Sequence, residues 1–409
     1  MTFAPPDEQM ATLLRGCEAV YNEAELRAKL DTARKENRPL RIKLGMDPTA
    51  PDIHLGHTVV LRKMRQFQDF GHQAVLIIGD YTARIGDPTG RTKTRPILDE
   101  ATIRQNAETY FQQAGQVLDT HSDRIEIRYN GEWLAPLNLA DILRLTSHMT
   151  VAQMLQRENF KKRMAEDKEI VMTELMYPLM QGYDSVAIDS DLELGGTDQT
   201  FNNLVGRDLM EKYGKPPQVV MIMPILRGLD GVEKMSKSLG NYVGVTDSPK
   251  DMFGKTMSIA DEMMREWYTL LTLILKDEID ALLDAGRTHP RAAKVRLAKE
   301  IVTQYYDAAA ADREEELWQK VMVEGGLRDD LPEGSVPRGE LDGEGRIWVP
   351  KLLKLLGMCP STGEGRRMIC GGGVYIDQQR VTDPQAKLSP ADGMIVQVGK
   401  RKAARLKIE

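Results

Sequence analysis

The chain has 409 residues, a hydrophobic fraction of 41% and a formal net charge of -6. This length exceeds what one hydrophobic core usually supports, so we expect two or three domains. No apolar run of about 18 residues could span a bilayer, and the first 17 residues lack the apolar stretch of a signal peptide, so we expect a cytoplasmic protein. Cys17, Cys359 and Cys370 form no CxxC pair, which fits a reducing compartment and argues against a structural metal site.

The first half of the chain begins with a predicted βαβ unit. Residues 41–45 form a strand-like run that breaks into the turn 47–51. A helix follows in which apolar residues such as Val60 and Met64 recur at helical spacing. Residues 74–78 then have the continuous apolar character of a strand buried inside a parallel sheet.

A second glycine-rich turn, 86–90, follows that strand, and residues 219–225 predict another strand. Between them, residues 98–180 are mostly helical in pattern and interrupt the sheet. We expect this insertion to carry the interface of a homodimer. The fold class is therefore α/β, with a Rossmann-like parallel-sheet catalytic domain over residues 1–246.

The last third of the chain predicts two further domains. Residues 247–322 are helical in pattern, with Trp267 and Leu270 on one apolar stripe. Residues 323–346, rich in Gly, Pro, Asp and Glu, are typical of a linker. Residues 347–409 hold 11 Lys and Arg against 5 Asp and Glu, which predicts a small basic α+β module on an acidic body.

Two motifs point to phosphate chemistry. His54 and His57 are three residues apart at the start of the predicted helix, where backbone N–H groups attract anions, and Gly56 lets a flat ring approach. A capping or metal-binding pair is the alternative, but no carboxylate or cysteine stands at ligand spacing. Lys234 and Lys237, in the run KMSKS, place two mobile ammonium groups on one loop, which suits charge that develops in a transition state. A solvated basic loop is the ordinary alternative for such a pair.

A third set of residues predicts a pocket. Tyr177, Gln181 and Asp184 have the spacing that stacks a phenol, an amide and a carboxylate along one helix face. An exposed polar face is the alternative, but apolar neighbours such as Leu175 favour a pocket. The turn 195–199 delivers a further carboxylate, although its spacing also suits a plain hairpin loop.

HLGH and KMSKS resemble the signature motifs of class I aminoacyl-tRNA synthetases. The runs GMDPTA, GDPTG, YPLMQGYD and GGTDQ narrow the resemblance to bacterial tyrosyl-tRNA synthetases, over essentially the whole chain. The tryptophanyl relatives tend to carry a methionine at the position of Gln181 and lack the basic tail. The resemblance implies activation of L-tyrosine with ATP, transfer to tRNA, Mg²⁺ accompanying the ATP, and a homodimer.

The resemblance also assigns roles to residues. Asp87, Tyr177 and Gln181 would hold the tyrosine ammonium and align its carboxylate, and Asp184 would accept the phenolic hydroxyl. A buried acceptor rejects phenylalanine because it would be left unpaired, a rule for which this enzyme family is itself the usual illustration. The tyrosine site would consist of Asp47, Asp87, Tyr177, Gln181, Asp184 and Gln199. The ATP site would consist of Gly45, Gly56, Gly196, Asp198, Met235 and Ser236, and the catalytic set of Thr49, His54, His57, Arg91, Arg95, Lys234 and Lys237.

One departure from the family pattern concerns the phenol. Lys43, followed by Leu44, stands where the commonest form has a second phenol-binding tyrosine, and Thr200 replaces a frequent tryptophan. A subgroup of the bacterial enzymes shares the KLG run, so the resemblance holds, but the partner of the phenol's second hydrogen bond stays open.

The tail resembles a small RNA-binding domain shared with a ribosomal protein and pseudouridine synthases. Its Arg366, Arg367, Lys400 and Arg401 would meet tRNA phosphates. A solvated basic surface is the alternative. For the whole chain the alternatives are a tryptophan-specific synthetase, a free-standing nucleotidyltransferase, and an RNA-binding or regulatory protein that has lost its chemistry.

Overall fold

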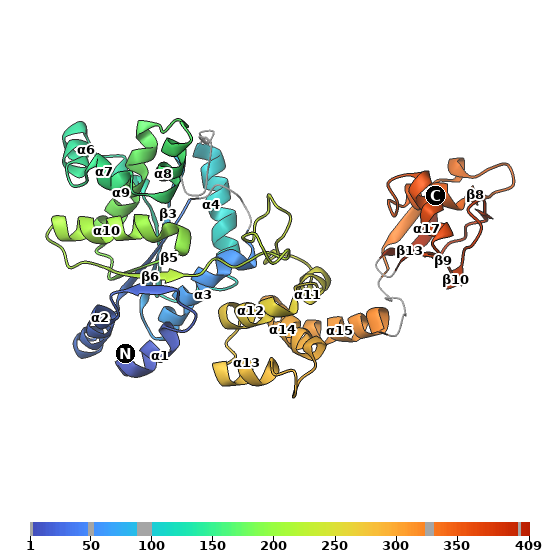
Figure 1. Ribbon diagram of the computed structural model, residues 1–409, viewed down its shortest axis with the longest axis horizontal. Helices are drawn as coiled ribbons and strands as arrows, with labels where there is room; N and C mark the ends of the chain where they lie inside the picture. Colours follow the sequence, from blue (N-terminus) through green and yellow to red (C-terminus); the bar gives the residue numbers. More distant parts are fainter. Residues whose placement is uncertain (1–2, 48–52, 88–99, 324–330, 400–401) are drawn as a thin grey trace. The chain divides into compact units, whose positions relative to one another are not determined.

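The computed structural model describes most of the chain in two compact units, residues 1–311 and 312–409 (Figure 1). The described residues are 3–47, 53–87, 100–323, 331–399 and 402–409. Five predicted site residues lie outside them, namely Thr49, Arg91, Arg95, Lys400 and Arg401. Within the described residues, no helix is long and apolar enough to cross a membrane.

The first unit is built on a six-stranded sheet in the order β1-β6-β5-β2-β3-β4. Neighbouring strands are parallel except β1 and β6, which are antiparallel. The predicted strands at 41–45, 74–78 and 219–225 are confirmed as β2, β3 and β6. The strands are β1 Ala19–Tyr21, β2 Arg41–Met46, β3 Gln73–Ile78, β4 Ile125–Tyr129, β5 Leu192–Gly196 and β6 Val219–Met223.

Helices pack on both faces of this sheet. Side chains alternate along β2, so that Ile42 and Leu44 join the apolar core with helices on one face, whereas Lys43 faces α9 on the other. The core under the first face includes Phe67, which confirms the predicted amphipathic helix. The helices that border the sheet are α1 Pro6–Leu13, α2 Glu23–Glu36, α3 Leu55–Asp69, α9 Met172–Ile188 and α10 Thr200–Lys212.

The predicted insertion is only partly as expected. The sequence predicts that residues 98–180 interrupt the sheet. This prediction is wrong for β4, because β4 pairs in parallel with β3 and adds an edge strand to the sheet. A five-residue edge strand with no fully buried residue gives little periodic signal. Most of the other described residues in this range are helical, in α4 Glu100–Ala114, α5 Gly131–Leu134, α6 Leu139–Thr146, α7 Val151–Met154, α8 Glu158–Ala165 and the start of α9.

Most of the predicted helical domain 247–322 belongs to the first unit, which extends to residue 311, rather than to a separate unit. Arg15 donates to the main-chain carbonyls of Tyr268 and Ile274, and Trp267 is fully buried, so contacts cross the predicted boundary at 246. The unit division falls inside α15 instead. These helices are α11 Pro249–Met257, α12 Met264–Leu271, α13 Lys276–Leu282, α14 Pro290–Tyr305 and α15 Ala308–Trp318.

The second unit contains a five-stranded sheet in the order β10-β9-β12-β13-β7 and a two-stranded sheet of β11 and β8. The predicted linker 323–346 is wrong where it includes β7, because β7 pairs in parallel with β13. The glycine-rich and acidic composition of this segment gave no sign of the short edge strand in it. The elements are β7 Glu333–Val336, β8 Ile347–Trp348, α16 Val349–Leu355, α17 Thr362–Cys370, β9 Val374–Ile376, β10 Gln379–Arg380, β11 Lys387–Leu388, β12 Ile395–Val398 and β13 Lys402–Ile408.

Short turns complete the described structure. Four are 3-10 helices and one, η4, is a π-helix. They are η1 Thr82–Arg84, η2 Thr197–Gln199, η3 Asp261–Met263, η4 Gln319–Val323 and η5 Arg338–Glu340.

Candidate active site

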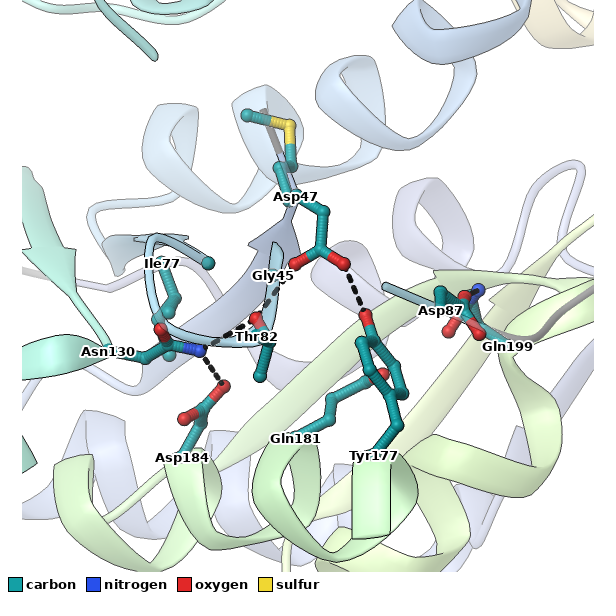
Figure 2. A pocket seen from close by; sticks show the side chains of 12 residues that line it. Gly45, Asp47, Ile77, Thr82, Asp87, Asn130, Tyr177, Gln181, Asp184 and Gln199 are labelled. Atoms are coloured by element: carbon teal, nitrogen blue, oxygen red, sulfur yellow. Dashed lines mark hydrogen bonds between the residues drawn. The ribbon is translucent and has the colours of Figure 1, made fainter. Parts of the chain in front are cut away.

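A cavity of about 230 Å³ opens where β2 and β3 end. In parallel sheets, ligands bind at this edge, outside the carboxyl ends of the strands. Helix α9 sends Tyr177, Gln181 and Asp184 into the cavity from successive turns, which confirms the predicted helix face (Figure 2). The lining residues are Gly45, Met46, Asp47, Ile77, Gly79, Thr82, Asp87, Asn130, Tyr177, Gln181, Asp184 and Gln199.

Asp184 is a buried acceptor at one side of the cavity. Its carboxyl is 2% exposed and receives one donor on each oxygen, Trp133 Nε1 at 2.8 Å and Asn130 Nδ2 at 3.4 Å. Burial raises the pKa of Asp184 to about 7, and the charge of Glu193 adds to this, whereas the charge of Lys43 and the two donors oppose it. The group therefore changes its charge in the neutral pH range.

A second carboxylate, Asp47, is held at the end of β2. Tyr177 donates its hydroxyl to Asp47 Oδ2 at 2.8 Å, and Thr82 donates to Asp47 Oδ1 at 2.8 Å. Burial and the nearby Asp47 carboxylate raise the pKa of the Tyr177 phenol, so it stays protonated and donates. A Cβ on Gly79 would lie 2.1 Å from Asp47 Oδ1, so this position has room only for glycine.

The third carboxylate, Asp87, lies on the opposite side of the cavity-lining side chains from Asp184 (Figure 2). Arg157 forms an ion pair with Asp87 at 2.9 Å, and Gln199 Nε2 donates to it at 2.7 Å. Arg157 is 5% exposed, so this pair is screened little by solvent. Sequence reasoning missed Arg157, which is 70 residues from its partner and stands between two short helices.

The HLGH histidines form a stacked pair at the start of α3. Their ring centroids are 3.8 Å apart, and the His54 main-chain N–H donates to His57 Nδ1 at 3.3 Å. A Cβ on Gly56 would lie 3.0 Å from the His54 ring, so a larger residue there would press on that ring. Burial is the main reason why the pKa of His54 falls to about 3 and that of His57 to about 4. Both rings are neutral at pH 7, so positive charge at this end comes from other groups.

The KMSKS segment packs against the HLGH motif. The Met235 side chain is 4% exposed and would contact a Cβ placed on Gly56 at 3.4 Å. The main-chain N–H of Leu55 donates to the Val243 carbonyl at 2.9 Å, which ties the segment after KMSKS to the start of α3. The structure thus brings together two motifs that are almost 180 residues apart.

One buried side chain organises the KMSKS loop. Asn241 accepts from the Ser236 N–H at 2.8 Å and donates to the Lys234 carbonyl at 3.2 Å and to Asp230. It is 6% exposed. Asn241 was not predicted, because its contacts lie five and seven residues back along the chain, outside the short-range patterns by which an Asn side chain is recognised in a sequence.

Of the two lysines of this loop, Lys234 is exposed and Lys237 is half-buried. Lys234 Nζ lies 3.8 Å from Asp198, with 54% of the side chain exposed. Lys237 Nζ lies 5.7 Å from the centroid of the Tyr242 ring. Asp198 and Lys234 line a second cavity of about 620 Å³, which also contains Arg157. Burial raises the pKa of Asp198, and the charge of Lys234 opposes this.

The HLGH pair lies beside the KMSKS loop at one edge of a parallel sheet, and this arrangement has counterparts among known proteins. The family model of class I tRNA synthetases (W and Y) matches residues 35–322, and that of the S4 domain matches residues 347–393. The chain belongs to the class I tRNA synthetases. It is therefore an aminoacyl-tRNA synthetase with a C-terminal S4 domain, which confirms the predicted fold class.

Similar proteins cover the whole chain. A tyrosine–tRNA ligase of Moorella thermoacetica is 50% identical over 401 residues, 97% of this chain and 95% of that protein. One of Salinibacter ruber is 47% identical over 409 residues, 100% of this chain and 98% of that protein. The fold also resembles that of the tyrosyl-tRNA synthetase of Archaeoglobus fulgidus in complex with L-tyrosine, with a TM-score of 0.60, 23% identity, and coverage of 76% and 99% of the two chains.

The structure places the predicted residues in three groups. The six residues assigned to tyrosine and Gly45 line the cavity. The described residues assigned to ATP and catalysis lie along the HLGH and KMSKS segments and the turn at η2. Arg366 and Arg367 lie on α17, where Arg366 stacks over Trp348 at 5.2 Å and Arg367 pairs with Glu364.

Lys43, whose role the sequence left open, does not line the cavity. It is fully buried beneath it, in an ion pair with Glu193. Lys43 does not donate to Asp184. The side chains that do are Asn130 and Trp133. Nothing in their local sequence marks them, because they stand in and beside the four-residue helix α5 that follows the unpredicted strand β4.

Proposed function

We propose that this chain activates L-tyrosine with ATP, releases pyrophosphate, and transfers the tyrosyl group from the adenylate to the 3′ end of its tRNA. The observation that carries the proposal is Asp184, a buried acceptor facing a small cavity with one donor already on each oxygen. A phenolic O–H would donate to a remaining lone pair of the carboxylate, whereas phenylalanine would leave that buried lone pair without a donor. The relatives named tyrosine–tRNA ligase support the same substrate.

The opposite side of the cavity suits the polar end of an amino acid. Asp47 and Asp87 carry negative charge, and Tyr177 and Gln181 add a hydroxyl and an amide. This set would hold the ammonium group and leave the substrate carboxylate beside Gln199. Arg157 offsets part of the charge and keeps Asp87 in place.

Catalysis would rest on position and charge. The tyrosine carboxylate attacks the α-phosphorus of ATP in line, the bond to the bridging oxygen breaks, and pyrophosphate leaves. Neutral His54 and His57 would donate hydrogen bonds, and Lys234 and Lys237 would approach the leaving pyrophosphate as its charge develops.

The remaining ATP residues would complete this site. Thr49, Arg91 and Arg95 would act on the phosphates. Mg²⁺ would arrive with the ATP phosphates, because this ion keeps several water ligands and is usually bound through substrate phosphates rather than by an all-protein site. The adenosine contacts would come from Gly45, Gly56, Gly196, Asp198, Met235 and Ser236.

The tRNA would contact the second unit through phosphates. Arg366 and Arg367 are proposed to act with Lys400 and Arg401, within the S4 domain. The helices from residue 247 onward would lie on the anticodon side. We place the protein in the cytoplasm, where its tRNA and ATP are found.

A homodimer is proposed through the insertion. Leu139 and Leu143 stand one turn apart on α6 and are 74% and 62% exposed, and Met172 at the start of α9 is 74% exposed. Large apolar side chains exposed together are typical of a protein interface. Light scattering of Leu139→Glu/Leu143→Glu against the native chain tests this, since an unchanged mass would contradict it.

The decisive test of the function is exchange of labelled pyrophosphate into ATP, with each of the twenty amino acids added separately. Exchange with tyrosine alone is expected. Exchange with tryptophan would move the assignment to the other branch of the family. No exchange with any amino acid would contradict an activating enzyme.

A further inference from the structure

Lys43 is a fully buried lysine directly below the cavity floor. It stands two residues before Gly45 on β2, and residues two apart face the same side of a strand, so it lies on the cavity side of the sheet but deeper. A buried ammonium group costs several kcal/mol of desolvation unless partners replace the water. The contacts of Lys43 therefore show what its charge is used for.

The three N–H donors of Lys43 meet three acceptors. These are Glu193 Oε1 at 2.9 Å, Ser185 Oγ at 2.7 Å and the Gln181 carbonyl at 2.9 Å. Gln181 and Ser185 are one turn apart on α9 and bracket Asp184. The ammonium group thus binds the helical turn that presents Gln181 and Asp184 to the cavity.

Glu193, the other half of the pair, reaches the same turn. It is 1% exposed on β5, and it accepts from Ser185 Oγ at 3.2 Å and from Gln181 Nε2 at 3.4 Å. Gln218 also donates to it. A Cβ on Gly206 would lie 2.9 Å from Ser185 Oγ and 3.2 Å from the Glu193 carboxylate, so the surrounding structure leaves no slack.

The two charges act on Asp184 in opposite senses. The charge of Lys43 lowers the pKa of Asp184, whereas that of Glu193 raises it. The other groups that act on Asp184 include the donors Trp133 and Asn130, which do not titrate, and the Tyr177 phenol, whose raised pKa keeps it neutral. Removing Lys43 is therefore expected to raise the pKa of Asp184, and removing Glu193 is expected to lower it.

We infer that the buried Lys43–Glu193 pair is a specificity-determining support of the amino-acid pocket, which holds the Gln181–Ser185 turn of α9 so that Asp184 meets the phenol. Lys43 touches no substrate and is a positioning residue. Lys43 does not bind the phenol as a second partner. It supports the first partner, Asp184, by fixing the helical turn that carries it. The inference rests on the proposed tyrosine specificity.

The test compares three variants in the full-length chain by pyrophosphate exchange with tyrosine and with phenylalanine, from pH 6 to 9. Lys43→Met alone leaves Glu193 buried without its cation and risks unfolding, so Lys43→Met/Glu193→Gln removes both charges. Glu193→Gln removes one charge but keeps an amide oxygen as an acceptor for Lys43. Lys63→Met is the matched control. Lys63 is also buried, but it donates to the carbonyls of Leu13 and Arg15, away from the cavity.

The double variant is expected to lose on the order of 10-fold in the tyrosine-to-phenylalanine ratio of kcat/KM, mainly through the KM for tyrosine. Glu193→Gln is expected to displace the pH midpoint of the tyrosine KM to lower pH. Lys63→Met is expected to lower the melting temperature without changing the ratio. An unchanged ratio in a folded double variant, together with an unmoved midpoint in Glu193→Gln, would overturn the inference. Failure of the native chain to activate tyrosine would instead overturn the proposed function.

Discussion

The proposed tyrosine end and the proposed nucleotide end of this site are built in opposite ways. Lys43, beneath the tyrosine end, is fully buried with three acceptors within 2.9 Å, whereas Lys234, at the nucleotide end, is 54% exposed with its nearest carboxylate at 3.8 Å. Both are lysines of the same structural unit. The first has an ordered set of partners, and the second can move toward charge that does not yet exist.

The difference follows from what each end must recognise. Telling a phenol from a phenyl group depends on one hydrogen bond, so its acceptor must be desolvated and already in place before the substrate arrives. Stabilising a leaving pyrophosphate depends on charge that appears during the reaction, so accessible cations are suitable. Neutral His54 and His57 are consistent with this division, since the pKa values of about 3 and 4 leave the charge to the lysines.

The largest expected effect is at the nucleotide end. Lys234→Ala should lower kcat for pyrophosphate exchange by on the order of 100- to 1,000-fold, because a charge aimed at the transition state is lost. The KM for tyrosine should change less than about 3-fold, because the tyrosine cavity does not include this residue. Steady-state exchange kinetics measures both values. Equal losses in binding and turnover would show that the two ends are not separate.

The converse change is at the tyrosine end. Asp184→Asn should reduce the tyrosine-to-phenylalanine ratio of kcat/KM by about 10- to 100-fold, since a hydrogen bond to a charged group contributes about 1.5 to 3 kcal/mol. The KM for ATP should stay unchanged. Asp191→Asn is the control, because Asp191 is also buried but pairs with Arg38 outside the cavity. A loss of discrimination in the control as well would point to general loosening.

The pH profile of the native enzyme gives a related prediction. Because the pKa of Asp184 is about 7, the KM for tyrosine should fall as pH rises from 6 to 8 and the carboxyl becomes an acceptor. The KM for phenylalanine should not follow, since phenylalanine has no hydroxyl to donate. The tyrosine dependence should vanish in Asp184→Asn. A profile that persists there would assign the titration to another group.

A smaller effect is expected from Asn241, which holds the KMSKS loop. Asn241→Ala should lower kcat about 10-fold and leave the KM for tyrosine unchanged, because the Ser236 N–H and the Lys234 carbonyl lose their common partner. Asn22→Ala is the matched control. Its side chain caps α2 by accepting from the Ala24 N–H, away from both motifs, so only stability should change. A similar fall in kcat in both variants would remove Asn241 from the catalytic argument.

Sequence reasoning found what depends on local order. The apolar runs gave β2, β3 and β6, and the spacing of Tyr177, Gln181 and Asp184 gave one wall of the cavity. These patterns arise from the periods of strands and helices, which need no knowledge of the fold.

What it missed depends on which elements become neighbours. The pairing of Lys43 with Glu193 requires β2 to lie beside β5, which the sequence does not state. Arg157 and Trp133 reach the cavity from short helices whose positions are set by tertiary packing. Of the strands that were not predicted, β4 and β7 are edge strands, where half of the pairing that defines a strand is absent, whereas β5 is a central strand.

The last prediction concerns stability rather than activity, and it contrasts Asp184 with Asp191. Burial raises the folded pKa of Asp184 from an ordinary 3.8 to about 7, so ionising it costs stability that grows as pH rises from about 4 to 7. Burial alone would also raise the pKa of Asp191, but hydrogen bonds from Arg38 and the Arg41 N–H outweigh it and lower the pKa, so its ionised form stabilises the fold above pH 4.

Asp184→Asn should therefore gain stability relative to the native chain between pH 5 and pH 8, on the order of 2 kcal/mol, whereas Asp191→Asn should lose stability at both pH values. Chemical denaturation of the three proteins at the two pH values measures this. If Asp184→Asn lost stability at pH 8 as much as Asp191→Asn does, the carboxylate at the tyrosine end would be a structural group. A gain in stability of Asp184→Asn at pH 8 means that the ionised Asp184 destabilises the native fold. The hydrogen bond from a bound phenol would then offset this destabilisation.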